Sequence, residues 1–306
     1  MSEIHYNSTT KMLCGFPKIK KLGAVSPNGE STPFVFNNRL MRLELQDATN
    51  GVDSDYKTSA IIRDRETGEI ISSFAEGCYY YSLYQENNKV YVLGTKSEKN
   101  SLCGSSIVIY ESTDLKNWEC RDLISRDGWQ FFNSSLTKGE NEYVLLLEFG
   151  PYPFSYTFAT STDMINWTFM SDDCIFAKDR YVGGPFMKYS NGWYYVIAVE
   201  ELPAKRYTNY IYRTKDFKTW YSGYYNPIFM PSEDDRIISP KAFELSEDLK
   251  EQIKTGFISS NSDIDMCDWN GKTLFTYNAG NQLGFYFLAE AEYDGSVAEF
   301  LEANFK

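Results

Sequence analysis

A motif that recurs along the chain limits the folds open to it more than any other feature. In each of three segments, 112–118, 161–167 and 213–220, two polar residues precede an Asp and a Trp follows that Asp four residues later. The three Trp residues lie about 50 residues apart, a period typical of propeller blades. The repeat therefore predicts a series of similar β-rich units.

Each repeat has enough chain for four strands. Ahead of the Asp, two β-rich runs are separated by a turn rich in Asn, Gly and charged residues, at 85–89, 138–141 and 190–192. Asn and Gly tolerate the positive φ that tight hairpins need. A third run follows at 106–110, 156–160 and 210–213, and a fourth begins at the Trp. Four antiparallel strands make one blade.

The flanking segments bring the number of blades to five. We expect an all-β fold, a five-bladed β-propeller of four-stranded antiparallel blades, as a single domain over residues 1–306. The expected blade boundaries are 30–75, 76–125, 126–175, 176–230 and 256–295. The segment 246–255 is rich in Leu, Glu and Lys and predicts an inserted helix, and 297–304 predicts a short terminal helix.

The charge of the chain narrows the classes of partner. The formal net charge is −12, so the field of the protein repels nucleic-acid phosphates and anionic lipid headgroups. The longest apolar runs, such as that from Val144 to Leu147, are too short to cross a bilayer of ~30 Å. No secretory signal is visible at the N-terminus, although a trimmed chain would hide one. We therefore expect a cytoplasmic protein that binds neither nucleic acid nor membrane, of open oligomeric state.

Cofactor and metal motifs are missing from the sequence. The six Cys residues show no Cys-x-x-Cys spacing, and His5 is the only histidine. There is neither a Walker-type phosphate loop nor an Asp-x-Asp-x-Asp-Gly calcium loop. We expect no cofactor and no metal, and the lone His argues against a Ser-His-Asp or Cys-His site. Of the catalytic chemistries considered, only one based on carboxylates remains.

Polar residues at the ends of the inner strands are the candidates for a site. In a propeller, these ends from all blades converge on the central channel. Partial burial raises a carboxyl pKa and suits it to acid catalysis near neutral pH. The candidate catalytic residues are Glu76, Glu148, Glu200 and Asp263, and the candidate substrate-binding residues are Asn133, Tyr79, Tyr181, Asp265 and Asn278. For each carboxylate the alternative is a strand-end acid paired to a nearby Arg, Lys or Tyr.

The blade pattern, together with the run 184–195 (Gly-Pro-Phe-Met-Lys-Tyr-Ser-Asn-Gly-Trp-Tyr-Tyr), resembles the five-bladed glycoside hydrolases of family 43 and its relatives over about residues 30–295. That resemblance implies an Asp base in blade one, a second Asp later and a Glu acid in a Glu-Gly-Pro motif. This sequence departs at all three places, with Thr32-Pro33, Asn133 and Gly183-Gly184-Pro185. The family's catalytic residues therefore do not carry over.

The resemblance and the acid set together imply a carbohydrate-active protein that cleaves a glycosidic bond of an oligosaccharide or glycoside with channel carboxylates. Glu76 or Asp263 is expected as base or nucleophile, and Glu148 or Glu200 as acid. A non-hydrolytic carbohydrate-binding propeller is the first alternative, because the family's catalytic acids are missing. A protein-interaction scaffold is the second, and it predicts a large apolar patch on one rim.

Overall fold

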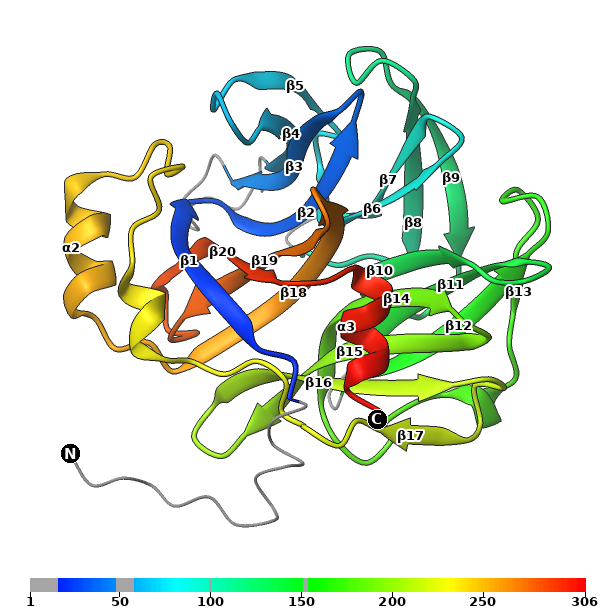
Figure 1. The fold of residues 1–306 in the computed structure, drawn as a ribbon. Helices are drawn as coiled ribbons and strands as arrows, with labels where there is room; N and C mark the ends of the chain where they lie inside the picture. Colours follow the sequence, from blue (N-terminus) through cyan, green and yellow to red (C-terminus); the bar gives the residue numbers. More distant parts are fainter. Residues whose placement is uncertain (1–15, 48–57, 99–100, 151–153) are drawn as a thin grey trace, which may run out of the picture.

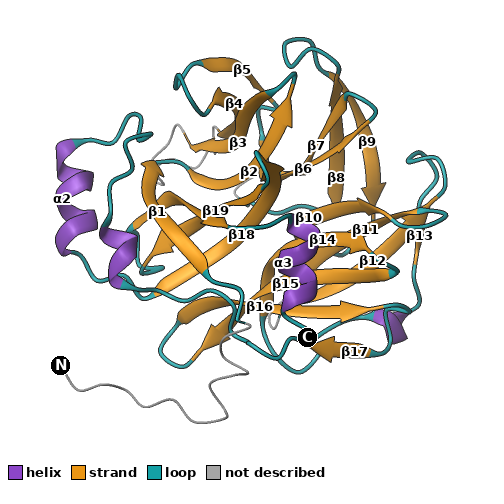
Figure 2. Cartoon of the chain, in the orientation of Figure 1, coloured by secondary structure: helices purple, strands orange, loops and turns teal. Residues whose placement is uncertain are grey.

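Five four-stranded antiparallel sheets are arranged in a ring around a central axis (Figures 1 and 2). The structure is a computed structural model that describes residues 16–47, 58–98, 101–150 and 154–306. The expected fold class, a five-bladed β-propeller, is confirmed. Among the described helices, none is long and apolar enough to span a bilayer.

Four of the blades are built from consecutive strands, the first strand of each lying innermost. Blade one contains β2 (Gly29–Phe36), β3 (Arg39–Asp47), β4 (Thr58–Asp64) and β5 (Ile70–Phe74). Blade two contains β6 (Cys78–Glu86), β7 (Lys89–Lys96), β8 (Ser106–Ser112) and β9 (Glu119–Ser125). Blade three contains β10 (Gln130–Lys138), β11 (Tyr143–Gly150), β12 (Ser155–Ser161) and β13 (Thr168–Phe169). Blade four contains β14 (Val182–Ser190), β15 (Trp193–Leu202), β16 (Arg206–Thr214) and β17 (Trp220–Ser222).

Blade five is completed by the other end of the chain. Its strands are β18 (Ser260–Trp269), β19 (Lys272–Gly280), β20 (Tyr286–Tyr293) and β1 (Ile19–Ser26), and β1 pairs antiparallel with β20. The expected boundary of 256–295 therefore omits the outer strand of this blade. The missing strand lies more than two hundred residues away in the sequence, where no repeat marks it. Pairing of the two ends closes the ring non-covalently.

The helices lie where the sequence favours them. A four-residue 3-10 turn, η2 (Glu233–Arg236), and the helix α2 (Glu247–Thr255) occupy the connection between blades four and five, and η1 (Asp172–Cys174) follows β13. The terminal helix α3 (Val297–Ala303) begins at a capping box in which Ser296 accepts from the amide of Glu299 and Glu299 accepts from that of Ser296.

The repeated Asp motif forms a tight turn between the third and fourth strands of blades two to four. In blade two, Asp114 Oδ1 accepts from the amides of Lys116 and Asn117, each at 2.8 Å. The residue after the Asp, Leu115, adopts a positive φ of 62° and is only 1% exposed. Asp163 and Asp216 bind the equivalent amides. The motif is thus a structural device that satisfies turn amides and anchors each turn in the core.

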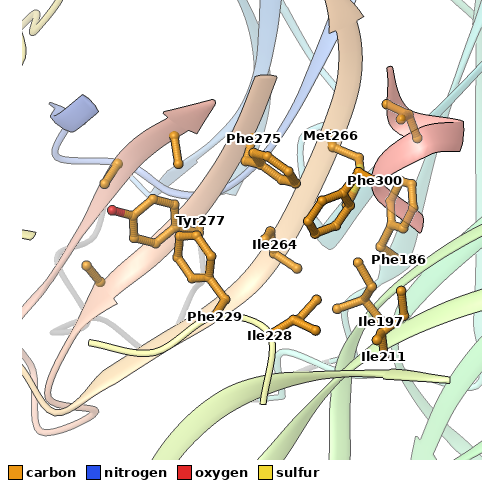
Figure 3. Packing of buried hydrophobic residues seen from close by; sticks show 14 of the residues in the cluster. Phe186, Ile197, Ile211, Ile228, Phe229, Ile264, Met266, Phe275, Tyr277 and Phe300 are labelled. Carbon is orange, nitrogen blue, oxygen red and sulfur yellow. The ribbon is translucent and has the colours of Figure 1, made fainter. Parts of the chain in front are cut away.

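The hydrophobic core is divided into layers between neighbouring blades. Figure 3 shows the layer between blades four and five, where Phe186, Ile197 and Ile211 meet side chains of β18 and β19. Phe300 of α3 packs against Phe275 in the same layer, with ring centroids 4.9 Å apart. The terminal helix therefore packs against blade five and stabilises it.

The contact between blades one and five is charged rather than apolar. Arg42 and Glu44 are fully buried, and Arg42 donates to Glu44 at 2.9 Å and to Glu290 of β20 at 3.0 Å. Arg63 also donates to Glu44, and Arg65 holds Glu290 from the other side at 2.8 Å. We call Arg42, Glu44, Arg63, Arg65 and Glu290 the closure cluster, because they join the first blade to the last.

Candidate functional site

Every inner strand has an irregularity close to its first residue, on one side of the ring. Antiparallel pairing with the second strand is interrupted in all five blades, and the residues that leave the register are Glu30, Tyr80–Tyr81, Phe132–Asn133, Gly184–Pro185 and Asp263–Ile264. Glu30, Tyr80, Gly184 and Asp263 all have positive φ, between 31° and 56°. Unpaired bulge residues re-aim side chains and are common beside functional sites.

The interruptions surround a small cavity on the axis. It measures about 30 Å³ and is lined by residues of all five inner strands, among them Glu30, Asn133, Gly184 and Asp263. This volume holds one or two water molecules. Glu148 adjoins the cavity residues from β11, opposite the interruption of β10. We call Glu30, Glu148 and Asp263 the acid cluster.

Glu148 is held by two hydrogen bonds to one of its oxygens. Its side chain is almost completely buried, and Oε2 accepts from Asn133 Nδ2 at 2.9 Å and from the Gly184 amide at 3.0 Å. A Cβ at Gly183 would lie 3.1 Å from Glu148 Oε1 and 2.5 Å from the hydroxyl of Tyr181. Glycine at 183 and 184 thus lets the backbone of blade four approach this carboxyl group.

Asp263 lies against the same glycine pair. Its Oδ1 would be 2.2 Å from a Cβ at Gly184, and its Oδ2 accepts from Asn278 at 3.4 Å. Backbone bond lengths limit the distance between an amide nitrogen and its own Cβ to about 2.5 Å, so Glu148 Oε2 and Asp263 Oδ1 lie no more than about 8 Å apart. Two predicted catalytic carboxyl groups are therefore brought together.

Replacing Gly184 by Ala tests this close approach. The new methyl group would collide with Asp263, and φ at 184 is +50°, so we expect a loss of stability beyond the ~1–2 kcal/mol of the left-handed conformation alone. Gly192→Ala is the matched control, since φ there is +77° and nothing lies within 4 Å of the added Cβ. Urea denaturation of both variants measures the difference. Equal losses would contradict the close approach.

Glu30 is the member of the acid cluster that the sequence did not reveal. Its amide donates to Asn278 Oδ1 at 3.3 Å, and its buried Oε2 has no hydrogen-bond partner in the described part of the chain. The resemblance to family 43 matches Thr32-Pro33 to the family's Asp-Pro step, two residues further along β2. The sequence signal that could have identified Glu30 is its position directly after the Pro27-Asn28-Gly29 turn, where the first strand of blade one starts.

Burial and like charge both raise the pKa values of these carboxyl groups. Burial, with a smaller contribution from the charge of Asp263, raises the pKa of Glu148 to about 7, against the hydrogen bonds from Asn133 and Gly184. Burial also raises the pKa of Asp263. The pKa of Glu30 is well above its ordinary range, because of burial and then the charges of Asp263 and Glu148. Glu30 and Glu148 therefore favour their protonated forms more than ordinary carboxyl groups do.

The other two predicted catalytic acids lie elsewhere. Glu200 accepts from Arg180 Nε at 3.2 Å and from the hydroxyl of Tyr212, so it fits the alternative of a paired strand-end acid. Glu76 is exposed in the turn before β6. No described interaction joins either residue to the acid cluster. Sequence could not separate them from Glu148, because all of them occupy polar positions at strand ends.

The predicted binding residues divide into two groups. Asn133 and Asn278 hold Glu148 and Asp263, as described above. Asp265 lies one step further along the channel, where Oδ2 accepts from Thr32 at 2.5 Å and Oδ1 accepts from the Met266 amide at 2.8 Å. Burial raises the pKa of Asp265 to about 7. Within the described ranges, no group of three or more His, Cys, Asp and Glu side chains has the geometry of a metal site.

Tyr79 and Tyr181 belong to a row of aromatic rings that crosses blades two, three and four. Successive ring centroids are 4.6 to 5.7 Å apart, and all five contacts are edge-to-face. The members of this aromatic row, in order, are Tyr79, Tyr80, Phe132, Phe154, Tyr181 and Tyr207. The Tyr181 hydroxyl and Glu148 Oε1 both lie close to Gly183, so the row is beside the acid cluster. Burial, and then the charges of Glu30 and Glu148, raise the pKa of Tyr80.

Comparison with known proteins extends the resemblance in fold. No protein-family model and no curated protein sequence matches the chain. Solved structures do: BT0996, in a complex with RGII, has a TM-score of 0.65 at 12% identity, covering 93% of this chain and 95% of that one. A GH62 α-L-arabinofuranosidase catalytic domain from Coprinopsis cinerea has a TM-score of 0.65 at 9% identity (92% and 99% covered). A glycosyl hydrolase from Bacteroides ovatus has a TM-score of 0.60 at 13% identity (88% and 84%). The likeness is one of fold.

Proposed function

We propose that the protein is a glycoside hydrolase in which Glu148 is the general acid and Asp263 is the base or nucleophile. The observation that carries the proposal is the pairing of the buried Glu148 with the partly buried Asp263 around Gly184. Their oxygens lie within about 8 Å, and glycosidases use carboxyl pairs ~5 Å apart for retention and ~6.5–9.5 Å apart for inversion. The known hydrolases of similar fold support the same reaction class.

The reaction needs one proton donor and one electron-pair donor. Glu148, with its pKa raised to about 7, is about half protonated at neutral pH, and its protonated form gives the proton to the glycosidic oxygen as the bond to the sugar breaks. The sugar carbon then accepts an electron pair either from water, which gives its proton to Asp263, or from Asp263 itself. The aromatic row offers apolar ring faces for a sugar next to these groups.

The proposal predicts how the rate depends on pH. Because Glu148 must be protonated, kcat should fall as pH rises through about 7, and the wild-type profile should show this limb. Hydrolysis of a panel of aryl glycosides and oligosaccharides, measured from pH 5 to 9, tests this. A cleaved substrate whose rate stays constant to pH 9 would contradict the role of Glu148.

Asp263→Ala separates the two roles open to Asp263. We expect a loss of at least about 100-fold in kcat/KM for the best substrate, because the variant lacks the group that supplies or activates the attacking electron pair. Added azide, a small anionic nucleophile, should restore activity and yield a glycosyl azide. The configuration of that azide relative to the wild-type product reports which role is correct. Full activity of the variant would remove Asp263 from the site.

A non-hydrolytic carbohydrate-binding protein is the second candidate. Two observations favour it: the cavity among the acids has room for water only, and Glu200 is already paired with Arg180. This candidate expects no hydrolysis across the panel but binding of at least one oligosaccharide, measured by calorimetry. Under this candidate, Glu148→Gln and Asp263→Asn would change the dissociation constant of the oligosaccharide by no more than a few fold.

A further inference from the structure

A second, larger pocket opens at the other end of the channel from the acid cluster. It has a volume of about 250 Å³ and is lined by all five inner strands and by Val297 at the start of α3. The exposed residues Lys188 and Asp268 mark its opening. Thr32, Ser82 and Asp265 line both this pocket and the small cavity, so they form the partition between the two.

The wall of this pocket contains hydroxyl groups whose hydrogens are not used. Ser135 Oγ accepts from the Met187 amide at 2.9 Å, and Thr137 Oγ1 accepts from the Tyr189 amide at 3.0 Å. These bonds connect the inner strands of blades three and four. Each hydroxyl still has its own O–H to donate, and no described residue accepts from either one.

The pocket is lined by groups of opposite charge. Asp265 presents a carboxyl group whose two oxygens each accept one hydrogen bond, which leaves further lone pairs. Burial raises the pKa of Asp265, and the Lys188 ammonium is close enough to oppose that rise. Lys188 makes no ion pair within the described residues. A ligand with a full charge of either sign would meet repulsion from one of these groups. A neutral ligand with several hydroxyl groups meets both a donor and an acceptor.

We call this second pocket, at the end of the channel away from the acid cluster, the lower channel pocket. We propose that it binds a neutral polyhydroxylated molecule of the size of a monosaccharide. Its volume admits one sugar ring and is too small to enclose an oligosaccharide. The hydroxyls of Ser135 and Thr137 and the Lys188 ammonium donate, and Asp265 accepts. The site is separate from the acid cluster and does not rest on glycoside cleavage.

Cys267 provides a reporter for the site. It is a partly buried free thiol that lines the lower channel pocket, whereas the free thiol of Cys120 is exposed on β9 in blade two. The experiment measures the rate of iodoacetamide alkylation of each cysteine by peptide mass mapping at pH 9.5 over an extended reaction time, because burial raises the pKa of the Cys267 thiol and the thiolate is the form that reacts. D-glucose, D-xylose and sodium gluconate are the probes, each at 100 mM. We expect the neutral sugars to slow alkylation of Cys267 at least twofold and to leave Cys120 unchanged.

Two variants locate the effect. Lys188→Met removes the unpaired cation at the opening and should reduce the protection by glucose, whereas Lys116→Met removes an exposed lysine in a turn of blade two and should not. Glu148→Gln should retain full protection, because the acid cluster is a different site. Absence of protection by both sugars, equal slowing at Cys120, or stronger protection by gluconate than by glucose would each overturn the proposal.

Discussion

Replacing Glu148 by Gln is expected to lower kcat/KM for glycoside hydrolysis by about 10²–10⁴-fold, the usual contribution of a positioned general acid. The amide is the same size as the carboxyl group and still offers an oxygen to Asn133 and Gly184, so the fold should be retained. The loss should shrink for substrates with a strongly acidic leaving group, such as a dinitrophenyl glycoside, because that group departs without protonation. The fall in rate above pH 7 should disappear at the same time.

Glu76→Gln is the matched control for this experiment. It makes the same change of Glu to Gln in an exposed turn, and we expect activity within about twofold of wild type because Glu76 lies outside the acid cluster. Steady-state kinetics with one activated and one unactivated glycoside measures both variants. If Glu76→Gln were the inactive variant, or if the loss at Glu148 were equal for both leaving groups, Glu148 would not be the acid.

The second large effect is expected at the closure cluster. Glu44→Gln should reduce the free energy of unfolding by about 3–5 kcal/mol, because it removes the buried carboxylate that Arg42 and Arg63 share. Arg42 then keeps only Glu290 as a counter-charge, and Arg63 keeps only the exposed Glu244. Burial opposes ionisation of Glu44, but the charges of Arg42 and Arg63 outweigh it and lower its pKa. The stabilisation is therefore present above the unfolded pKa of about 4 and is lost as pH falls through the lower folded value.

Urea denaturation at pH 7 measures this loss, with Glu292→Gln as control. Glu292 is an acid of β20 that is paired with Lys20 at 3.6 Å and with Lys272 at 3.0 Å, and both lysines are exposed to solvent. Solvent-exposed pairs contribute up to about 1 kcal/mol, so the control should cost no more than that. A loss at Glu44 no larger than at Glu292 would show that the buried charges do not hold the ring closed.

The closure cluster also explains why an acid at the end of a strand is a weak sign of catalysis. Glu44, Glu148 and Glu200 are all acids in the second strand of a blade, and the sequence around them does not distinguish their roles. Glu44 neutralises two arginines, Glu200 is paired with Arg180, and only Glu148 lies beside other carboxyl groups. The arginines that pair with Glu44 and Glu200 lie within 20 residues of them in the same blade, whereas the carboxyl groups near Glu148 come from other blades.

The sequence by itself determined the blade and the number of blades. The Asp motif is a local device, in which Asp114, Asp163 and Asp216 bind amides two and three residues onward, so its spacing reports the repeat directly. Hairpin turns at residues such as Asn191 and Gly192 are equally local, because positive φ is a property of single residues. Both signals depend on contacts within a few residues, which a sequence displays.

Only the tertiary structure decided which residues meet on the axis. Glu30 and Asp263 come from opposite ends of the chain, and Glu148 reaches them through a glycine pair in a fourth blade. The outer strand of blade five and the closure cluster likewise join residues more than two hundred positions apart. These contacts depend on how the ring closes and on one- or two-residue interruptions in the strand register, and local sequence patterns do not encode either.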